Sequence, residues 1–184
     1  MTTIFEKIVK VPILETPRLL LRSHARTDFE SSVQMWADPL VTRFIGGKPN
    51  TPQQTWAKML THLGHWWMMG FGYWAIEEKS SGRHIGEMGF ADLQRTMEPA
   101  LDAPELGWAL ASDSHGKGYS TEALRCILQW ADSNQPWTKT VCIIDPENRP
   151  SLRVAEKIGY KEIYRTQYQE KPVVVLSRQV SLSS

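Results

Sequence analysis

The spacing of apolar residues along the chain switches between a period typical of strands and a period typical of helices. Short apolar or alternating runs predict strands within residues 13–24 and at 72–77, 84–90, 105–110, 140–144, 160–168 and 172–179. Apolar residues at helical spacing predict helices at 28–38, 51–67, 118–135 and 148–159. The short polar turn between the 72–77 and 84–90 runs indicates a hairpin.

The predicted helices begin and end at residues that favour such boundaries. Asp28 and Asn148 are candidate N-caps, Pro52 suits a first turn, and Gly159 suits a helix end. This order of elements predicts an α+β protein in which helices cover both faces of a central sheet, an α/β/α arrangement. A chain of 184 residues can bury roughly two thirds of its unfolded surface. We therefore expect one domain over residues 1–184, with its core at about 13–180.

Charge, cysteine content and the terminal sequence narrow the class of protein. The formal net charge is +1, so we expect no general attraction to nucleic acid or to an anionic membrane. Cys126 and Cys142 form no CxxC motif and no disulfide framework, which fits a reducing compartment. Residues 1–7 lack the pattern of a leader, and no apolar run reaches the roughly 18 residues that span a bilayer. These features predict a cytoplasmic protein.

A glycine-containing turn at residues 112–122 joins a predicted strand to a predicted amphipathic helix. Gly116 and Gly118 let the backbone turn tightly, so that successive N–H groups can face one anion at the helix N-terminus. An ordinary helix start also explains these residues. The dinucleotide-binding fingerprint needs a third glycine, and the P-loop needs GxxxxGK[ST]; neither motif is present.

Three segments in this order resemble a known family: RHIGEMGF, PELGWALASDSHGKGYSTEAL and VCIIDPENRPSLRVAEKIGYKEI. They are similar to the Gcn5-related N-acetyltransferases (GNAT), specifically the RimJ/RimL-like branch, and the resemblance covers about residues 13–180. It implies the acyl-coenzyme A N-acyltransferase fold, with a mixed sheet of about seven strands and about four helices. It also implies acetyl-coenzyme A as cosubstrate and no metal.

The resemblance assigns residues to coenzyme A. The diphosphate would bind mainly through backbone amides of the turn, at His115, Gly116, Lys117, Gly118, Tyr119, Ser120 and Thr121. The pantetheine arm would pair with the strand at Trp108, Ala109 and Leu110. Asp113 replaces the family's Gln or Arg; it should weaken binding, and Lys117 would offset part of that effect. Asn148 would contact the arm or only cap its helix, and Arg153 would meet the adenosine 3′-phosphate or face solvent.

Acyl transfer to an amine needs a proton acceptor and a proton donor. The amine attacks in its unprotonated form, and the departing thiolate takes up a proton. Glu105 opens the strand that the resemblance places beside the thioester, so we expect it to act as base directly or through a water. Ser151 matches the serine of the family's NxxS motif and is the expected acid, because the tyrosine acid of other members would fall at Ala155. A solvated strand-end carboxylate and an ordinary first-turn serine are the plainer alternatives.

The acceptor and the partners are less well specified. His62 and His65 lack HExxH and an evident third ligand, so we expect packing rather than a metal site. Several aromatic residues are candidates for an acceptor pocket, although core filling is expected for most of them: Trp36, Trp56, Trp66, Trp67, Tyr73 and Trp74. The expected partner is a primary amine, on a protein N-terminus or on a small molecule such as an antibiotic or amino acid. A non-catalytic acyl-coenzyme A sensor is the alternative, and either a monomer or a homodimer is compatible with the sequence.

Overall fold

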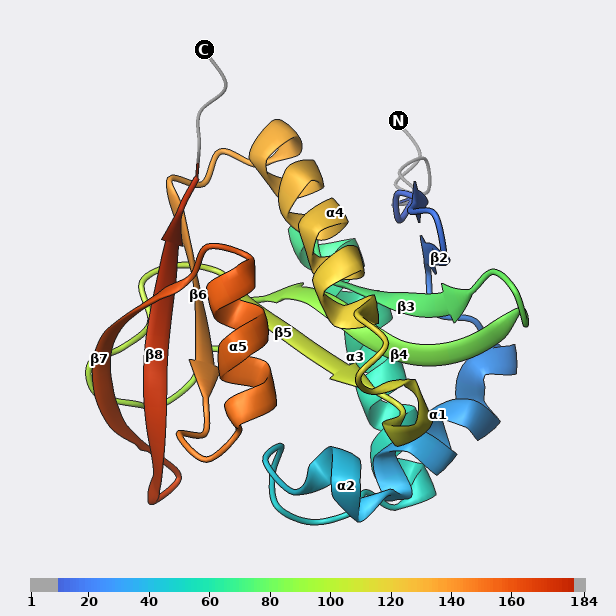
Figure 1. Ribbon diagram of the computed structural model, residues 1–184, viewed down its shortest axis with the longest axis horizontal. Coiled ribbons are helices and arrows are strands. Elements are labelled where there is room, and N and C mark those ends of the chain that lie inside the picture. The colour runs from blue at the N-terminus through green and yellow to red at the C-terminus, as the bar shows by residue number, and fades with distance from the viewer. Residues whose placement is uncertain (1–9, 181–184) are drawn as a thin grey trace, which may run out of the picture.

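The computed structural model describes residues 10–180 as a mixed eight-stranded sheet with helices on both faces (Figure 1). Residues 1–7, where the sequence predicts no leader, lie outside the described part. The strands are β1 (Leu14–Glu15), β2 (Leu19–Arg22), β3 (Tyr73–Glu78), β4 (Arg83–Ala91), β5 (Glu105–Leu110), β6 (Lys139–Ile144), β7 (Lys161–Tyr168) and β8 (Lys171–Gln179). The helices are α1 (Phe29–Ala37), α2 (Pro39–Thr42), α3 (Pro52–Met69), α4 (Tyr119–Asn134) and α5 (Arg149–Lys157).

The sheet has one parallel junction, and this junction is incomplete. The strand order is β1-β2-β3-β4-β5-β6-β8-β7, and every neighbouring pair is antiparallel except β5 with β6. Those two strands pair only where Glu105 lies opposite Val141, whereas β5 pairs along its whole length with β4. Beyond Glu105 the two strands separate, as Figure 1 shows, so one edge of β5 is left without a strand partner.

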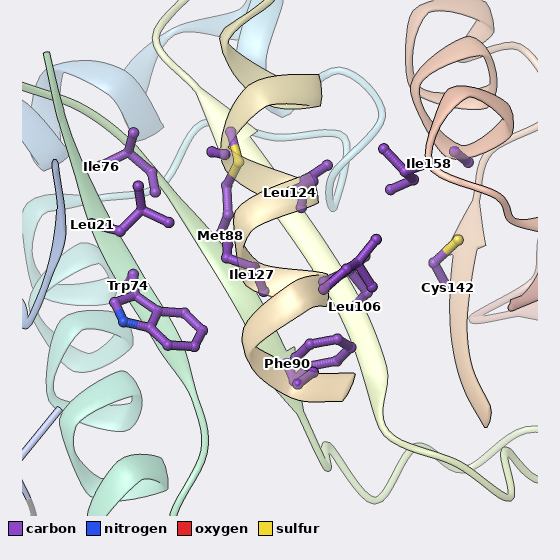
Figure 2. Close-up of a cluster of buried hydrophobic side chains, with 14 of the residues drawn as sticks. Leu21, Trp74, Ile76, Met88, Phe90, Leu106, Leu124, Ile127, Cys142 and Ile158 are labelled. Carbon is purple, nitrogen blue, oxygen red and sulfur yellow. The ribbon is translucent and has the colours of Figure 1, made fainter. Parts of the chain in front are cut away.

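The core lies between the sheet and α4. Figure 2 shows Leu124 and Ile127 of this helix facing Met88, Phe90 and Leu106 of the central strands. All five side chains are almost completely buried. Their spacing on α4 is the apolar stripe that the sequence predicts. In Figure 1, α4 and α5 lie in front of the sheet, and α1 and α3 lie behind it, so the predicted layers are confirmed.

Local sequence explains the boundaries of most elements. Thr51 and Gln54 form a capping box at the start of α3, and Gly70 ends this helix in the left-handed conformation, with φ of 72°. Asn148 caps α5 through its side-chain oxygen, which accepts from Ser151 N at 3.2 Å. Asp28, however, gives α1 no side-chain cap, and that prediction is wrong.

The Asp28 carboxylate instead forms an ion pair with Arg22. Its two oxygens accept hydrogen bonds from the Arg22 guanidinium at 2.7 and 2.8 Å, and one also accepts from Ala25 N. The structure also contains one helix and one strand more than expected, α2 and the two-residue β1. No helix in the described part of the chain is long and apolar enough to cross a membrane.

Candidate active site

A cavity of about 580 Å³ opens where β5 and β6 separate. Its lining includes five residues that the sequence predicts for the site, from two separate parts of the chain: Glu105, Trp108 and Ala109 on β5, and Asn148 and Ser151 at the start of α5. Leu110 does not line the cavity; its side chain belongs to the core. The predicted base, acid and arm-binding strand therefore surround one space.

The glycine turn follows β5 and leads into α4. Gly116 and Gly118 have φ of 74° and 81°, a left-handed conformation that glycine adopts without strain. Within the described residues, the backbone N–H groups of residues 116–121 donate to no protein acceptor, and the first helical bond runs from Glu122 N to Gly118 O. Such a run of free donors at a helix N-terminus is suited to bind an anion.

His115 differs from the other residues assigned to the turn. Its N–H donates to Ser112 O at 3.1 Å, and its ring contacts Leu110 O through Nε2 at 2.9 Å. The backbone group of His115 is thus engaged by the protein itself. Its side chain stabilises the connection between β5 and the turn.

Side-chain contacts with Arg18, just before β2, and with Glu78 on β3 stabilise the turn. Arg18 donates to Lys117 O at 2.9 Å, pairs with Glu122 and lies over the Tyr119 ring at 4.5 Å. Tyr119 is buried and donates through its hydroxyl to Glu78. Lys117 O and the Tyr119 side chain therefore have structural roles, which leaves the backbone N–H groups of both residues as the available donors.

Asp113 does not leave an uncompensated negative charge beside the turn. Its carboxylate accepts from the Arg83 guanidinium at 2.8 Å. This hydrogen bond lowers the pKa of the Asp113 carboxyl below its usual value. The chain therefore compensates for the acidic replacement chiefly through Arg83, a residue that the sequence analysis did not single out.

The proposed acid and its neighbours lie at the start of α5. Ser151 lines the cavity, and Asn148 both lines it and caps the helix. Ala155, at the position of the tyrosine acid in other family members, is fully buried. Arg153 is exposed and makes no ion pair within the described residues, so its predicted contact with the 3′-phosphate stays a prediction.

Glu105 is buried against the cavity wall in a two-point ion pair. Arg95 donates to both carboxylate oxygens, at 2.6 and 2.9 Å, and the guanidinium also lies over the Tyr168 ring. The solvated strand-end alternative is thus wrong for Glu105, which is 7% exposed. Arg95 comes from the long loop before β5, which explains why periodicity did not reveal it.

A second polar cluster, which was not predicted, places Lys58, His62 and Glu87 in the lining of the same cavity. His62 on α3 contacts Glu87 on β4 with 2.9 Å between Nε2 and Oε1, and His24 Nε2 lies 3.7 Å from Glu87 Oε2. Lys58 Nζ lies 3.9 Å from Oε1. The sequence feature that could have revealed this cluster is Glu87, in the middle of the apolar RHIGEMGF run, because a charged residue in a buried strand requires partners.

The remaining candidates have structural explanations. Both ring nitrogens of His65 have partners, Phe71 O at 2.7 Å and Asp92 N at 2.9 Å. Burial raises the pKa of Cys126 and of Cys142, which fits inert thiols. Of the aromatic candidates, the cavity lining includes only Trp36 and Tyr73, while the others are core or surface residues: Trp56, Trp66, Trp67 and Trp74.

Comparison with known proteins identifies the family. YkkB of Bacillus subtilis is 32% identical over 109 residues, which span 59% of this chain and 62% of YkkB. The uncharacterized N-acetyltransferase p20 of Bacillus licheniformis is 25% identical over 150 residues, 81% of this chain and 82% of p20. A crystal structure of an acetyltransferase from Agrobacterium tumefaciens has 29% identity and a TM-score of 0.80, over 92% of this chain and 95% of that one. The family model described as an acetyltransferase (GNAT) domain matches residues 18–161, and the chain therefore belongs to the GNAT acetyltransferase family.

Proposed function

We propose that the protein, as one domain over residues 1–184, transfers the acetyl group of acetyl-coenzyme A to a primary amine. One observation carries the proposal: the turn with free N–H groups at 116–121 and the cavity with Glu105 and Ser151 lie along the same strand, β5. The open edge of β5 between them suits the pantetheine arm. The N–H groups suit the diphosphate, so the residues present fit coenzyme A.

The chemistry requires two proton transfers in a ternary complex. A bond forms between the amine nitrogen and the acetyl carbon, and the bond from that carbon to sulfur breaks. The nitrogen loses a proton to a base in the cavity, and the Ser151 hydroxyl donates a proton to the departing thiolate. Ser151 then regains a proton from solvent and the base releases its own, which closes the proton balance. Glu105, paired with Arg95, is the base that the sequence favours; His62, paired with Glu87, is a further candidate in the cavity.

The acceptor is proposed only by class. RimL, described as a ribosomal L7/L12 alpha-N-protein acetyltransferase in complex with coenzyme A, has a TM-score of 0.74 but 14% identity, which is evidence for the fold alone. The RimJ/RimL-like branch, and a protein N-terminus or a small-molecule amine as acceptor, are therefore part of the proposal. The proposal also includes a cytoplasmic location, a monomeric or homodimeric protein, and a reaction that involves neither a metal nor nucleic acid.

A thiol-release assay with a panel of amines tests the function. We expect release of free coenzyme A that depends on the amine, with stoichiometric acetylated amine identified by mass spectrometry. Ser151→Ala should lower kcat by about ten-fold or more, and Ser151→Thr, which keeps a hydroxyl, should retain more activity. Tight binding of acetyl-coenzyme A without thiol release for any amine would instead indicate a non-catalytic sensor.

A further inference from the structure

We infer that His62 takes the proton from the acceptor amine and that Glu87 is the positioning residue that holds His62 for this task. The inference rests on the proposed acetyl transfer and assigns the base within it. Neither residue was part of the predicted catalytic pair.

The hydrogen bond with Glu87 fixes the tautomer. A carboxylate can only accept, so the 2.9 Å contact between Oε1 and Nε2 requires the proton on Nε2. The lone pair of the neutral ring is then on Nδ1. Among the described residues, Nδ1 has no hydrogen-bond partner, and it is not among the buried unpaired atoms either. Since His62 lines the cavity, Nδ1 is the basic atom available to a ligand there.

The surroundings keep the carboxylate ionised and the imidazole neutral. Burial raises the pKa of the Glu87 carboxyl, but the hydrogen bond from His62, the nearby His24 and the charge of Lys58 outweigh burial and hold that pKa well below its usual range. Burial lowers the pKa of His62, and the attraction of Glu87 only partly opposes it. At neutral pH the ring is therefore unprotonated at Nδ1 and able to accept a proton.

The position of the ring brings it toward β5. The His62 ring stacks with the Tyr73 ring, with centroids 4.5 Å apart, and with the His24 ring, with centroids 5.1 Å apart. The Tyr73 hydroxyl in turn lies against Gly107, where a Cβ atom would come within 1.8 Å of that oxygen. The Tyr73 ring, on which His62 stacks, therefore reaches β5, the strand proposed to hold the thioester arm. The stacking also restricts rotation of the imidazole.

Two other candidate bases in the cavity, Glu105 and His65, are engaged. Both oxygens of Glu105 accept from Arg95, and proton uptake there would weaken a buried ion pair. Both ring nitrogens of His65 have backbone partners. His62 Nδ1 is the basic atom that remains among these three side chains. A carboxylate that orients a histidine is also a recurrent arrangement for a general base.

The test compares two acceptor amines in the His62→Gln variant. Glutamine keeps an amide donor for Glu87 but has no basic atom. For an alkylamine with a pKa of about 10.4, we expect kcat/KM at pH 7 to fall about 100-fold or more. The loss should shrink as pH rises, because more of the amine is already unprotonated. For an alkoxyamine, which is unprotonated at pH 7, the loss should be less than about ten-fold.

Several ionisable groups surround His62, so the experiment compares the ratio of the variant's kcat/KM to that of the wild type at each pH. They are His24 after β2, Lys58 on α3, Tyr73 on β3, His84 and Glu87 on β4, and Glu105 on β5. An equal loss with both amines at every pH would overturn the inference while the proposed function stands. Wild-type protein that acetylates no amine would contradict the proposed function itself.

A second measurement does not depend on activity. Nitrogen-15 NMR of the wild-type protein at pH 7 should show His62 with Nε2 protonated and Nδ1 unprotonated, and the reverse tautomer would overturn the inference. In Glu87→Gln this preference should weaken, since the amide can also donate to Nε2. Activity that is lost with a chelator and restored by Zn²⁺ would also overturn it, because His24, His62 and Glu87 are close enough together to bind a metal.

Discussion

Replacing Ser120 by proline probes the diphosphate site by removing one backbone donor. Ser120 is the second residue of α4, and its N–H makes no bond within the described chain. Proline is tolerated in a first turn because that N–H has no intrahelical partner. The chain itself provides a precedent at the same position of α5, where Pro150 follows Arg149. Ser120→Ala is the matched control, since it removes the hydroxyl but keeps the N–H.

The expected effect follows from the strength of one hydrogen bond to a charged group. Such a bond contributes about 1.5–3 kcal/mol, so Ser120→Pro should bind coenzyme A about 10- to 100-fold more weakly than Ser120→Ala. No helical hydrogen bond is lost, and we expect the two melting temperatures to differ by less than about 4 °C, the shift for about 1 kcal/mol in a chain of this size. Titration calorimetry gives both dissociation constants.

Binding of pantetheine, a fragment of coenzyme A, shows which part of the binding site the Ser120→Pro substitution affects. Pantetheine lacks the diphosphate, so it should bind both Ser120 variants alike. Equal affinity for coenzyme A in two folded variants would refute the assignment of the 116–121 amides to the diphosphate. A loss of affinity that is equally large for pantetheine would refute it too, because the damage would then lie along β5.

Two further predictions concern stability. Asn148→Ala removes the cap of α5 and should lower the free energy of unfolding by about 1 kcal/mol in thermal melts, whereas Asn148→Asp keeps the cap; equal losses would contradict the capping role. Burial raises the pKa of the Asp28 carboxyl, but Arg22 outweighs burial and holds that pKa below its usual value. The stabilisation from Asp28 is therefore complete above pH about 4 and is lost as pH falls through the lowered pKa. In urea unfolding, Asp28→Asn should be less stable by about 3 kcal/mol at pH 7 and should lose less stability on acidification, and parallel acid profiles would contradict this.

The sequence predicted most helices and strands because their periodicity and caps agree. The α4 stripe, which includes Leu124 and Ile127, and the Asn148 cap each define their element without tertiary information. Asp28 shows where local reasoning fails. Its side chain suits a cap, but the partly buried guanidinium of Arg22 is a stronger partner for a buried carboxylate, and it becomes adjacent only after folding.

The sequence predicted the part of the candidate site that local backbone conformation forms. It did not predict the part formed by side chains that are distant in sequence. The 116–121 turn follows from glycines and a helix start, which are local. The Arg95 ion pair with Glu105 depends on how a long loop returns to β5. The contact of His62 with Glu87 depends on α3 packing behind β4, 25 residues apart in sequence. Spacing alone could not bring either pair together.

The most direct test of the account is a crystal structure of the protein with coenzyme A. We predict the diphosphate on the N–H groups of residues 116–121, the pantetheine arm along the open edge of β5, and the sulfur at the cavity near Ser151. Coenzyme A bound elsewhere, or N–H groups of 116–121 that remain turned away from the diphosphate, would contradict the account.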